Sequence, residues 1–259
     1  MTTLEKFVDY SNRLRDSLAA RDEVLGLVLV GSTADLGRVD EWSDHDFYVI
    51  TKDGHAEALR QDLSWLPDHE DIMWRPRETD HGLKVVYKDA SVLEFAVFDD
   101  KELDAAGANA YNVTLDRSNI TERMVAIAER SKPKAYSFDP EFEIFLSQLL
   151  IGVGRARRGE TLIAGQFVRS YCLNRALGFI RAWVAPKPGT EPKEDNLDRF
   201  RRFEQQYPEL GARVEGILQQ PVEKAAKELV ELVLELGAGR LTDSHLAQAQ
   251  LVQKRFSWI

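Results

Sequence analysis

Three carboxylates stand at positions where strands would normally carry apolar residues. Asp44 and Asp46 begin the segment "SDHDFYVI", and Glu94 stands inside "SVLEFAVF" between Leu93 and Phe95. Because strand side chains alternate between faces, Asp44 and Asp46 should share one face, about 7 Å apart at ~3.3 Å per residue. A glutamate in so apolar a run is unusual, since Glu is rarely buried unless it is paired. We therefore expect Glu94 on a neighbouring strand, facing the aspartates; the alternative is a solvated edge position.

Carboxylates gathered in this way predict a cation between them. Like charges that lie close together repel, and burying one without a partner is costly. Oxygen ligands with positions left for phosphate are what Mg²⁺ prefers. Glu94 could complete such a metal site or accept a proton from an attacking hydroxyl.

A glycine and a serine, Gly31 and Ser32, follow the apolar run Val24 to Val30 directly. Glycine lets a phosphate approach the backbone closely, and a small hydroxyl with neighbouring N–H groups can hold terminal phosphates. Taken alone, the pair reads as an ordinary turn after a strand. The aspartates a dozen residues later are what make phosphate binding the better interpretation.

The elements that must position these residues can be read from the first half of the chain. The spacing of apolar residues predicts a helix from residue 3 to about 24, and the continuous run 24–30 predicts a strand buried on both faces. A second strand should begin at Asp46, and a second helix should span 56–66. Residues 71–76, 83–88 and 92–98 are rich in β-branched and aromatic residues, which favours strands. A mixed sheet with flanking helices follows.

The pattern changes to long helical periods in the second half. We expect helices over 141–160, 161–185, 196–210, 222–237 and 241–256, separated by Pro and Gly. The fold class is therefore α+β, with a mixed-sheet domain over 1–135 and a helical bundle domain over 136–259. A chain of 259 residues is long for one core, which favours two domains.

Bulk composition narrows the partners and the compartment. The formal charge of −9 disfavours nucleic acid, because binders grip the phosphate backbone with a surplus of Lys and Arg. The single cysteine, Cys172, rules out an intramolecular disulfide and should be a buried apolar side chain. No apolar run reaches membrane-span length, and the start "MTTLEKFVDY" does not resemble a signal peptide. We expect a cytoplasmic protein without a membrane partner.

The segment "GSTADLGRVDEWSDHDFYVI" resembles the signature of the nucleotidyltransferase superfamily related to DNA polymerase beta. In that superfamily a Gly-Ser turn precedes a Ser-Asp-x-Asp strand, and a third acidic residue lies on a later strand. Within it, one such domain followed by a helical half, with "RRGETLIAGQFVRS" and "LDRFRRFEQQYP", is similar to bacterial lincosamide and aminoglycoside nucleotidyltransferases. Domain 1–135 would then be catalytic, and 136–259 would bind the substrate.

The resemblance implies a role for each site residue. Gly31 and Ser32, with Ser43, would bind the nucleotide; Asp44, Asp46 and Glu94 would be catalytic and would bind Mg²⁺, with Glu94 the general base. The implied reaction passes a nucleoside monophosphate from Mg-NTP, with ATP the expected nucleotide, to a hydroxyl of a small molecule, such as an antibiotic in a resistance reaction, and releases pyrophosphate.

Alternatives remain at three points. The acceptor could instead be a protein or an RNA, or the chain could be a catalytically silent nucleotide-binding protein. His45 stands where an aliphatic residue is usual, and a structural hydrogen bond on the far side of the sheet is the expected role. Arginines of the second domain could meet phosphates or pair with nearby acids; they are Arg155, Arg157, Arg158, Arg169, Arg199, Arg201 and Arg202. No oligomeric state is predicted.

Overall fold

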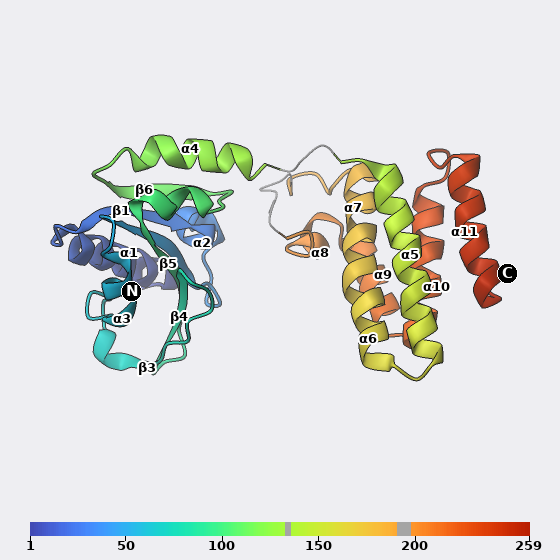
Figure 1. Ribbon diagram of the computed structural model, residues 1–259, viewed down its shortest axis with the longest axis horizontal. Helices are drawn as coiled ribbons and strands as arrows, with labels where there is room; N and C mark the ends of the chain where they lie inside the picture. Colours follow the sequence, from blue (N-terminus) through green and yellow to red (C-terminus); the bar gives the residue numbers. More distant parts are fainter. Residues whose placement is uncertain (133–135, 191–197) are drawn as a thin grey trace. The chain divides into compact units, whose positions relative to one another are not determined.

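The computed structural model describes residues 1–132, 136–190 and 198–259, which form two compact units, Met1–Lys132 and Pro133–Ile259. The first unit holds a mixed sheet with helices against it, and the second is helical (Figure 1). The predicted α+β class is confirmed. The domain boundary predicted after residue 135 falls beside residues 133–135, which lie outside the described part of the chain.

A six-stranded sheet with the order β3-β4-β5-β2-β1-β6 forms the centre of the first unit. Only β2 and β5 run parallel to each other among these neighbours; the other pairs are antiparallel. The strands are β1 (Val24–Val30), β2 (His45–Thr51), β3 (Ile72–Trp74), β4 (Gly82–Tyr87), β5 (Val92–Asp99) and β6 (Tyr111–Asp116). The central strands β1, β2 and β5 are the apolar runs of the sequence, because both of their faces are covered.

Each face of the sheet has its own apolar core. Helices α1 (Thr3–Ala19) and α3 (Ala56–Gln61) pack on the face that carries Phe47, Phe95 and Val97. Helix α4 (Ile120–Arg130) covers the other face and lies along β6 (Figure 1). The short elements of this unit are α2 (Gly31–Ala34), η1 (Leu36–Arg38), η2 (His69–Asp71) and η3 (Asp100–Ala105).

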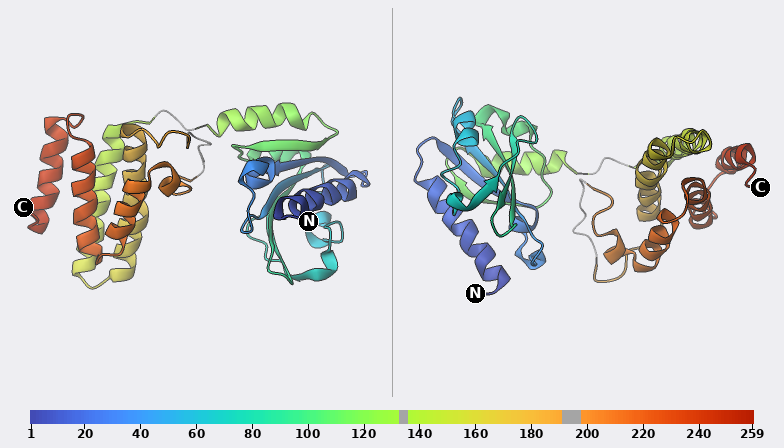
Figure 2. Two further views of the ribbon diagram at one scale, coloured as in Figure 1. Left: turned by 180° about the vertical axis from the view of Figure 1, so that it is seen from behind. Right: turned by 90° about the horizontal axis from the view of Figure 1, so that it is seen from below.

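The second unit is a helical bundle around one apolar core. Its long helices lie side by side in both views (Figures 1 and 2). The helical elements of the described part of this unit are α5 (Phe138–Arg157), α6 (Thr161–Gln166), a π-helical turn (Phe167–Cys172), α7 (Leu173–Trp183), α8 (Phe203–Gln206), α9 (Pro208–Leu218), α10 (Val222–Leu236) and α11 (Asp243–Phe256). Among the helices of the described residues, none combines the length and apolar composition of a membrane span.

Several predicted elements differ from the structure. The helix predicted over 56–66 ends at Gln61, since the backbone turns extended at Asp62, whose carboxylate instead binds Ser64. The helix predicted over 196–210 is wrong for residues 199–202: α8 begins at Phe203, after Arg202 in the left-handed conformation. Residues 196 and 197 lie outside the described chain. Strand β6 and helix α4 were not predicted.

Candidate functional site

The structure brings the three predicted carboxylates together. Strand β2 pairs in parallel with β5 so that Asp46 lies opposite Glu94, and Asp44 directly precedes β2. One carboxylate oxygen from each of the three lies within 4.8 Å of the others. We call Asp44, Asp46 and Glu94 the carboxylate trio. The order of the strands makes this convergence, because it places two segments fifty residues apart in the sequence beside each other.

The trio is less buried than an apolar strand would suggest. Asp44 and Asp46 are half-buried, and the side chain of Glu94 keeps 48% of its surface exposed. Glu94 therefore faces the aspartates as predicted and also reaches water. The alternative of an edge position is wrong, because β5 lies between β4 and β2 in the sheet. Exposure lowers the cost of gathering three negative charges, because water screens their repulsion.

Gly31 lies against the carboxylate of Asp46 where β1 ends. Its backbone has φ +59°, a conformation that favours glycine. A Cβ at this position would lie 2.5 Å from Oδ2 of Asp46, closer than any side chain can approach. The position thus requires glycine for two separate reasons, and both result from placing the turn beside the trio.

The turn after β1 also holds the strand that carries the aspartates. The hydroxyl of Thr33 accepts a hydrogen bond from the backbone N–H of Asp46, 2.9 Å away, and Thr33 is buried. The Ser32 hydroxyl donates to the backbone carbonyl of Asp44 at 3.2 Å. Ser32, predicted to bind phosphate, is therefore next to the trio and in this structure joins the turn to it. Sequence reasoning missed Thr33, whose place two residues after Gly31 was its one available signal.

Ser43 closes a hydrogen-bonded turn just before the trio. Its hydroxyl accepts from the N–H of Asp40 at 2.9 Å and donates to the Asp40 carboxylate at 3.2 Å. The same carboxylate accepts from the N–H of Trp42, whose side chain is 85% exposed. Ser43 thus shapes the turn that leads into Asp44 and presents the Trp42 indole to solvent.

The electrostatic surroundings of the trio include a cation, Lys84, beside Glu94. The ammonium of Lys84 lies 3.6 Å from Oε2 of Glu94. Its hydrogen bond to Glu78 and the charge of Glu94 raise the pKa of Lys84, which keeps the side chain charged. Burial, with further contributions from Asp46 and Glu94, raises the pKa of Tyr48, whose hydroxyl donates to the carbonyl of Gly107. Sequence reasoning gave no signal for Lys84.

His45 has a structural role on the opposite face of the sheet. Its ring stacks on Phe7 at a centroid distance of 3.7 Å, and Nε2 lies 3.1 Å from the Phe7 carbonyl oxygen. Burial lowers the pKa of His45 to about 4, so the ring is neutral near pH 7. The predicted hydrogen bond on the far side of the sheet is confirmed.

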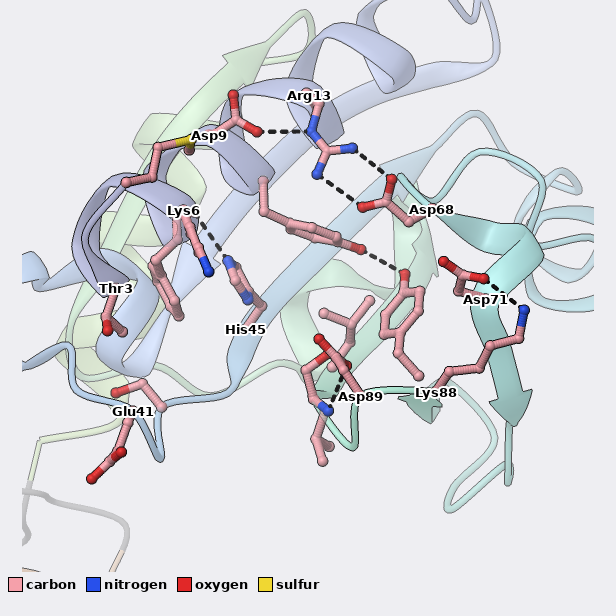
Figure 3. Close-up of a pocket in the computed structure, with 18 of the residues that line it drawn as sticks. Thr3, Lys6, Asp9, Arg13, Glu41, His45, Asp68, Asp71, Lys88 and Asp89 are labelled. Atoms are coloured by element: carbon pink, nitrogen blue, oxygen red, sulfur yellow. Dashed lines mark hydrogen bonds and ion pairs between the residues drawn. The ribbon is translucent and has the colours of Figure 1, made fainter.

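A cavity of about 600 Å³ lies on that opposite face, between α1, the turn 40–43 and the start of β5 (Figure 3). Arg13 bridges to Asp68 across one wall, and Lys88 pairs with Asp71 across another. His45 and Leu93 line it, whereas their neighbours Asp46 and Glu94 point to the other face. Strands β2 and β5 therefore lie between the cavity and the side chains of Asp46 and Glu94.

The chain is similar to several solved structures at low sequence identity. An aminoglycoside 6-adenyltransferase from Bacillus subtilis is 12% identical over 99% of both chains, with a TM-score of 0.38. The CD-NTase CdnG of Bradyrhizobium diazoefficiens, solved in complex with GTP, is 14% identical over 99% of this chain and 93% of its own, with a TM-score of 0.31. The c-di-GMP synthase CdnE of Capnocytophaga granulosa is 13% identical over 92% and 81%, also at 0.31.

No protein-family profile and no curated protein matches the chain.

The arginines of the second unit mostly have partners within it. Arg155 pairs with Glu160 at 2.5 Å, and Arg158 lies 3.5 Å from the same glutamate. Arg157 pairs with Glu223. Arg169 donates to the carbonyl of Gln220, and Arg199 to the side chain of Asn174. Of the two alternatives, pairing with nearby acids is observed for Arg155, Arg157 and Arg158. Arg199, Arg201 and Arg202 precede α8 and are not helical.

Proposed function

We propose that this chain is a Mg²⁺-dependent nucleotidyltransferase. It would move a nucleoside monophosphate from ATP, or another nucleoside triphosphate, to a hydroxyl of a small molecule and release pyrophosphate. The observation that carries the proposal is the convergence of Asp44, Asp46 and Glu94 within 4.8 Å beside the glycine turn. Three carboxylates this close together repel one another, and a divalent cation between them would offset that repulsion.

The donor set of the trio fits a magnesium ion. All of its ligands are carboxylate oxygens, and their half-exposed position leaves room for water and phosphate ligands. Asp44, Asp46 and Glu94 would hold the ion, and the absence of a Cβ at Gly31 avoids a contact of 2.5 Å with Oδ2 of Asp46. When bound, such an ion neutralises charge on the phosphates and aligns the reacting oxygens for in-line displacement.

The remaining residues would bind and orient the substrates. The glycine at position 31 lets a triphosphate approach the backbone, and the Ser32 and Ser43 hydroxyls would exchange their present partners for phosphate oxygens. Glu94 would accept the proton of the acceptor hydroxyl. The acceptor oxygen then forms a bond to the α-phosphorus, while the bond from that phosphorus to the bridging oxygen breaks and pyrophosphate leaves with the electron pair.

The acceptor is proposed from the sequence resemblance. The resemblance to aminoglycoside and lincosamide nucleotidyltransferases suggests a small molecule with hydroxyl groups, an aminoglycoside or a lincosamide, and hence a role in antibiotic resistance. In this proposal, residues 1–135 carry the chemistry and residues 136–259 bind the acceptor. Nucleic acid is disfavoured as an acceptor by the net charge of −9.

Transfer of label from ATP tests the proposal. The chain is incubated with Mg²⁺, ATP labelled at the α-phosphate, and a panel of aminoglycosides and lincosamides. Labelled drug supports the proposal. Label on a protein or an RNA would show that this molecule, and not a small molecule, is the acceptor. Nucleotide binding without any transfer would refute the enzymatic function.

Two substitutions assign the chemistry to the trio. Asp46→Asn and Glu94→Gln should abolish transfer, whereas Asp22→Asn should not, because Asp22 is exposed in the turn between α1 and β1. Glu94→Gln should still bind Mg-nucleotide if Glu94 serves mainly as the base. Full transfer by either trio variant would remove the trio from the mechanism.

A further inference from the structure

A row of paired residues crosses one face of the sheet and extends the trio by one position. Lys84 on β4 lies opposite Glu94 on β5, which lies opposite Asp46 on β2. Leu83 and Val85, the neighbours of Lys84, are buried on the other face. Lys84 therefore stands on the same face as the trio, directly beside Glu94, as the next residue of the row.

The ammonium of Lys84 is held between two carboxylates. Its Nζ lies 3.6 Å from Oε2 of Glu94 and 3.0 Å from Oε2 of Glu78. Glu78 is anchored in turn by its backbone N–H, which donates to the carbonyl of Gly82 at 2.9 Å. The Lys84 side chain is 36% exposed, so its position is restricted while water still reaches it. Glu78 and Glu94 thus hold the Lys84 ammonium beside the trio.

We propose that Lys84 is a built-in counter-cation that weakens the affinity of the carboxylate trio for a divalent ion. Without metal, its charge offsets part of the repulsion within the trio and occupies Glu94. A divalent ion must then share Glu94 with the ammonium and is repelled by it. Lys84 is a positioning residue in this account, since it acts on the ion through Glu94. The inference rests on the proposed metal site, and it adds that Lys84 lowers the affinity of that site for a divalent ion.

The consequence for the proposed reaction is that the metal would be bound firmly only together with a nucleotide. Phosphate oxygens would add the ligands and the negative charge that the trio, partly neutralised by Lys84, does not supply. Glu78 would act in the opposite direction. The Glu78 carboxylate draws the Lys84 ammonium away from Glu94. When the charge of Glu78 is removed, Lys84 should pair with Glu94 alone.

Binding of Mn²⁺ to the full chain, without nucleotide, tests the inference. Free Mn²⁺ is counted by electron paramagnetic resonance at 0.1 M salt, where charges more than about 10 Å apart are largely screened. Lys84→Met should bind Mn²⁺ about three- to ten-fold more tightly, the size expected for removing one charge a few ångströms from a dication at a half-exposed site. Glu78→Gln should bind it several-fold more weakly, and Lys84→Arg should stay close to the wild type.

Lys88→Met is the matched control. Lys88 lies just beyond the end of β4 and pairs with Asp71 at 2.7 Å on the cavity side of the sheet, so its loss should leave Mn²⁺ affinity unchanged. Circular dichroism tests whether each variant is folded. If Lys84→Met does not fold, the direction of the change in Mn²⁺ affinity in Glu78→Gln decides whether the counter-cation role holds.

The outcomes separate this inference from the proposed function. If the wild type binds Mn²⁺ and Lys84→Met binds it equally or more weakly, the counter-cation role is overturned and the metal site stands. An equal or tighter affinity in Glu78→Gln also overturns the counter-cation role. If neither the wild type nor any variant binds Mn²⁺, the metal site itself is refuted, and this inference with it.

Discussion

Replacing Asp46 by Asn should stabilise the metal-free protein while removing its response to magnesium. Asn keeps the size of the side chain and removes one of three charges whose nearest oxygens lie within 4.8 Å of one another. Two repulsive pairs disappear, each about 0.9 kcal/mol at that distance with the dielectric constant of water. The gain in free energy of unfolding should therefore be at most about 2 kcal/mol, since Lys84 already offsets part of the repulsion near Glu94.

Thermal unfolding with and without Mg²⁺ measures both effects. Without metal, Asp46→Asn should melt several degrees higher than the wild type, at roughly 2–4 °C per kcal/mol for a protein of this size. Adding Mg²⁺ should raise the melting temperature of the wild type, because an ion that binds only the folded state stabilises it by mass action. The variant should respond far less.

The control is Asp22→Asn, which makes the same charge change at an exposed turn outside the trio. It should shift neither the metal-free melting temperature nor the response to Mg²⁺. A metal-free Asp46→Asn variant that is less stable than the wild type would show that the Asp46 carboxylate holds the fold together and is not a strained ligand. A variant that keeps the wild-type response to Mg²⁺ would refute the trio as the binding site.

Three further predictions concern packing, hydrogen bonding and burial within the two units. Gly152→Ala should cost about 1–3 kcal/mol in thermal melts, because its Cβ would lie 2.9 Å from that of Phe167, whereas Gly154→Ala, whose Cβ would meet no described atom within 4 Å, should not destabilise. Partial burial raises the pKa of Asp116, but hydrogen bonds at the start of α4 lower it to about 2. The ionised Asp116 should therefore stabilise the fold above about pH 4, and this stabilisation should vanish as the pH falls toward 2. In urea unfolding, Asp116→Asn should lose less free energy of unfolding than the wild type over the same pH range. Burial raises the pKa of Cys172 to about 12, so a thiol reagent at pH 8 should label it only after unfolding, and rapid labelling of the native protein would contradict its burial.

The central strands and the convergence of the trio could be predicted from the sequence. The run Val24–Val30 is apolar throughout because both of its faces are covered, and that pattern matches β1 residue for residue. Glu94 stood out because its neighbours are apolar. Parallel pairing with β2 then placed it opposite Asp46, which the alternation of side chains had already oriented.

Elements that depend on tertiary packing for their stability could not be predicted from the sequence. Strand β6 is a half-buried edge strand that carries Asn112 and Thr114, so it lacks the continuous apolar run that marked β1. Helix α4 buries only Ile120, Met124 and Ile127. The contacts of Lys84 could not be predicted at all, because they depend on the register between β4 and β5.

The two glycines of α5 differ in how closely other residues approach them. A Cβ at Gly152 would lie within 3.2 Å of Phe167 and Val168. A Cβ at Gly154 would meet no described atom within 4 Å. A glycine in a helical period marks close packing only where the facing helix happens to approach, and periodicity alone does not say which face that is.

The connection between β2 and β5 links the proposed chemistry to the order of folding. Asp46 and Glu94 become neighbours only when the chain has passed through α3, β3 and β4 and returned to lie parallel beside β2. Closing such a long excursion is entropically costly and slow compared with forming a hairpin. Capture of Mn²⁺ during refolding should therefore report completion of the sheet, lagging behind the first secondary structure seen by circular dichroism.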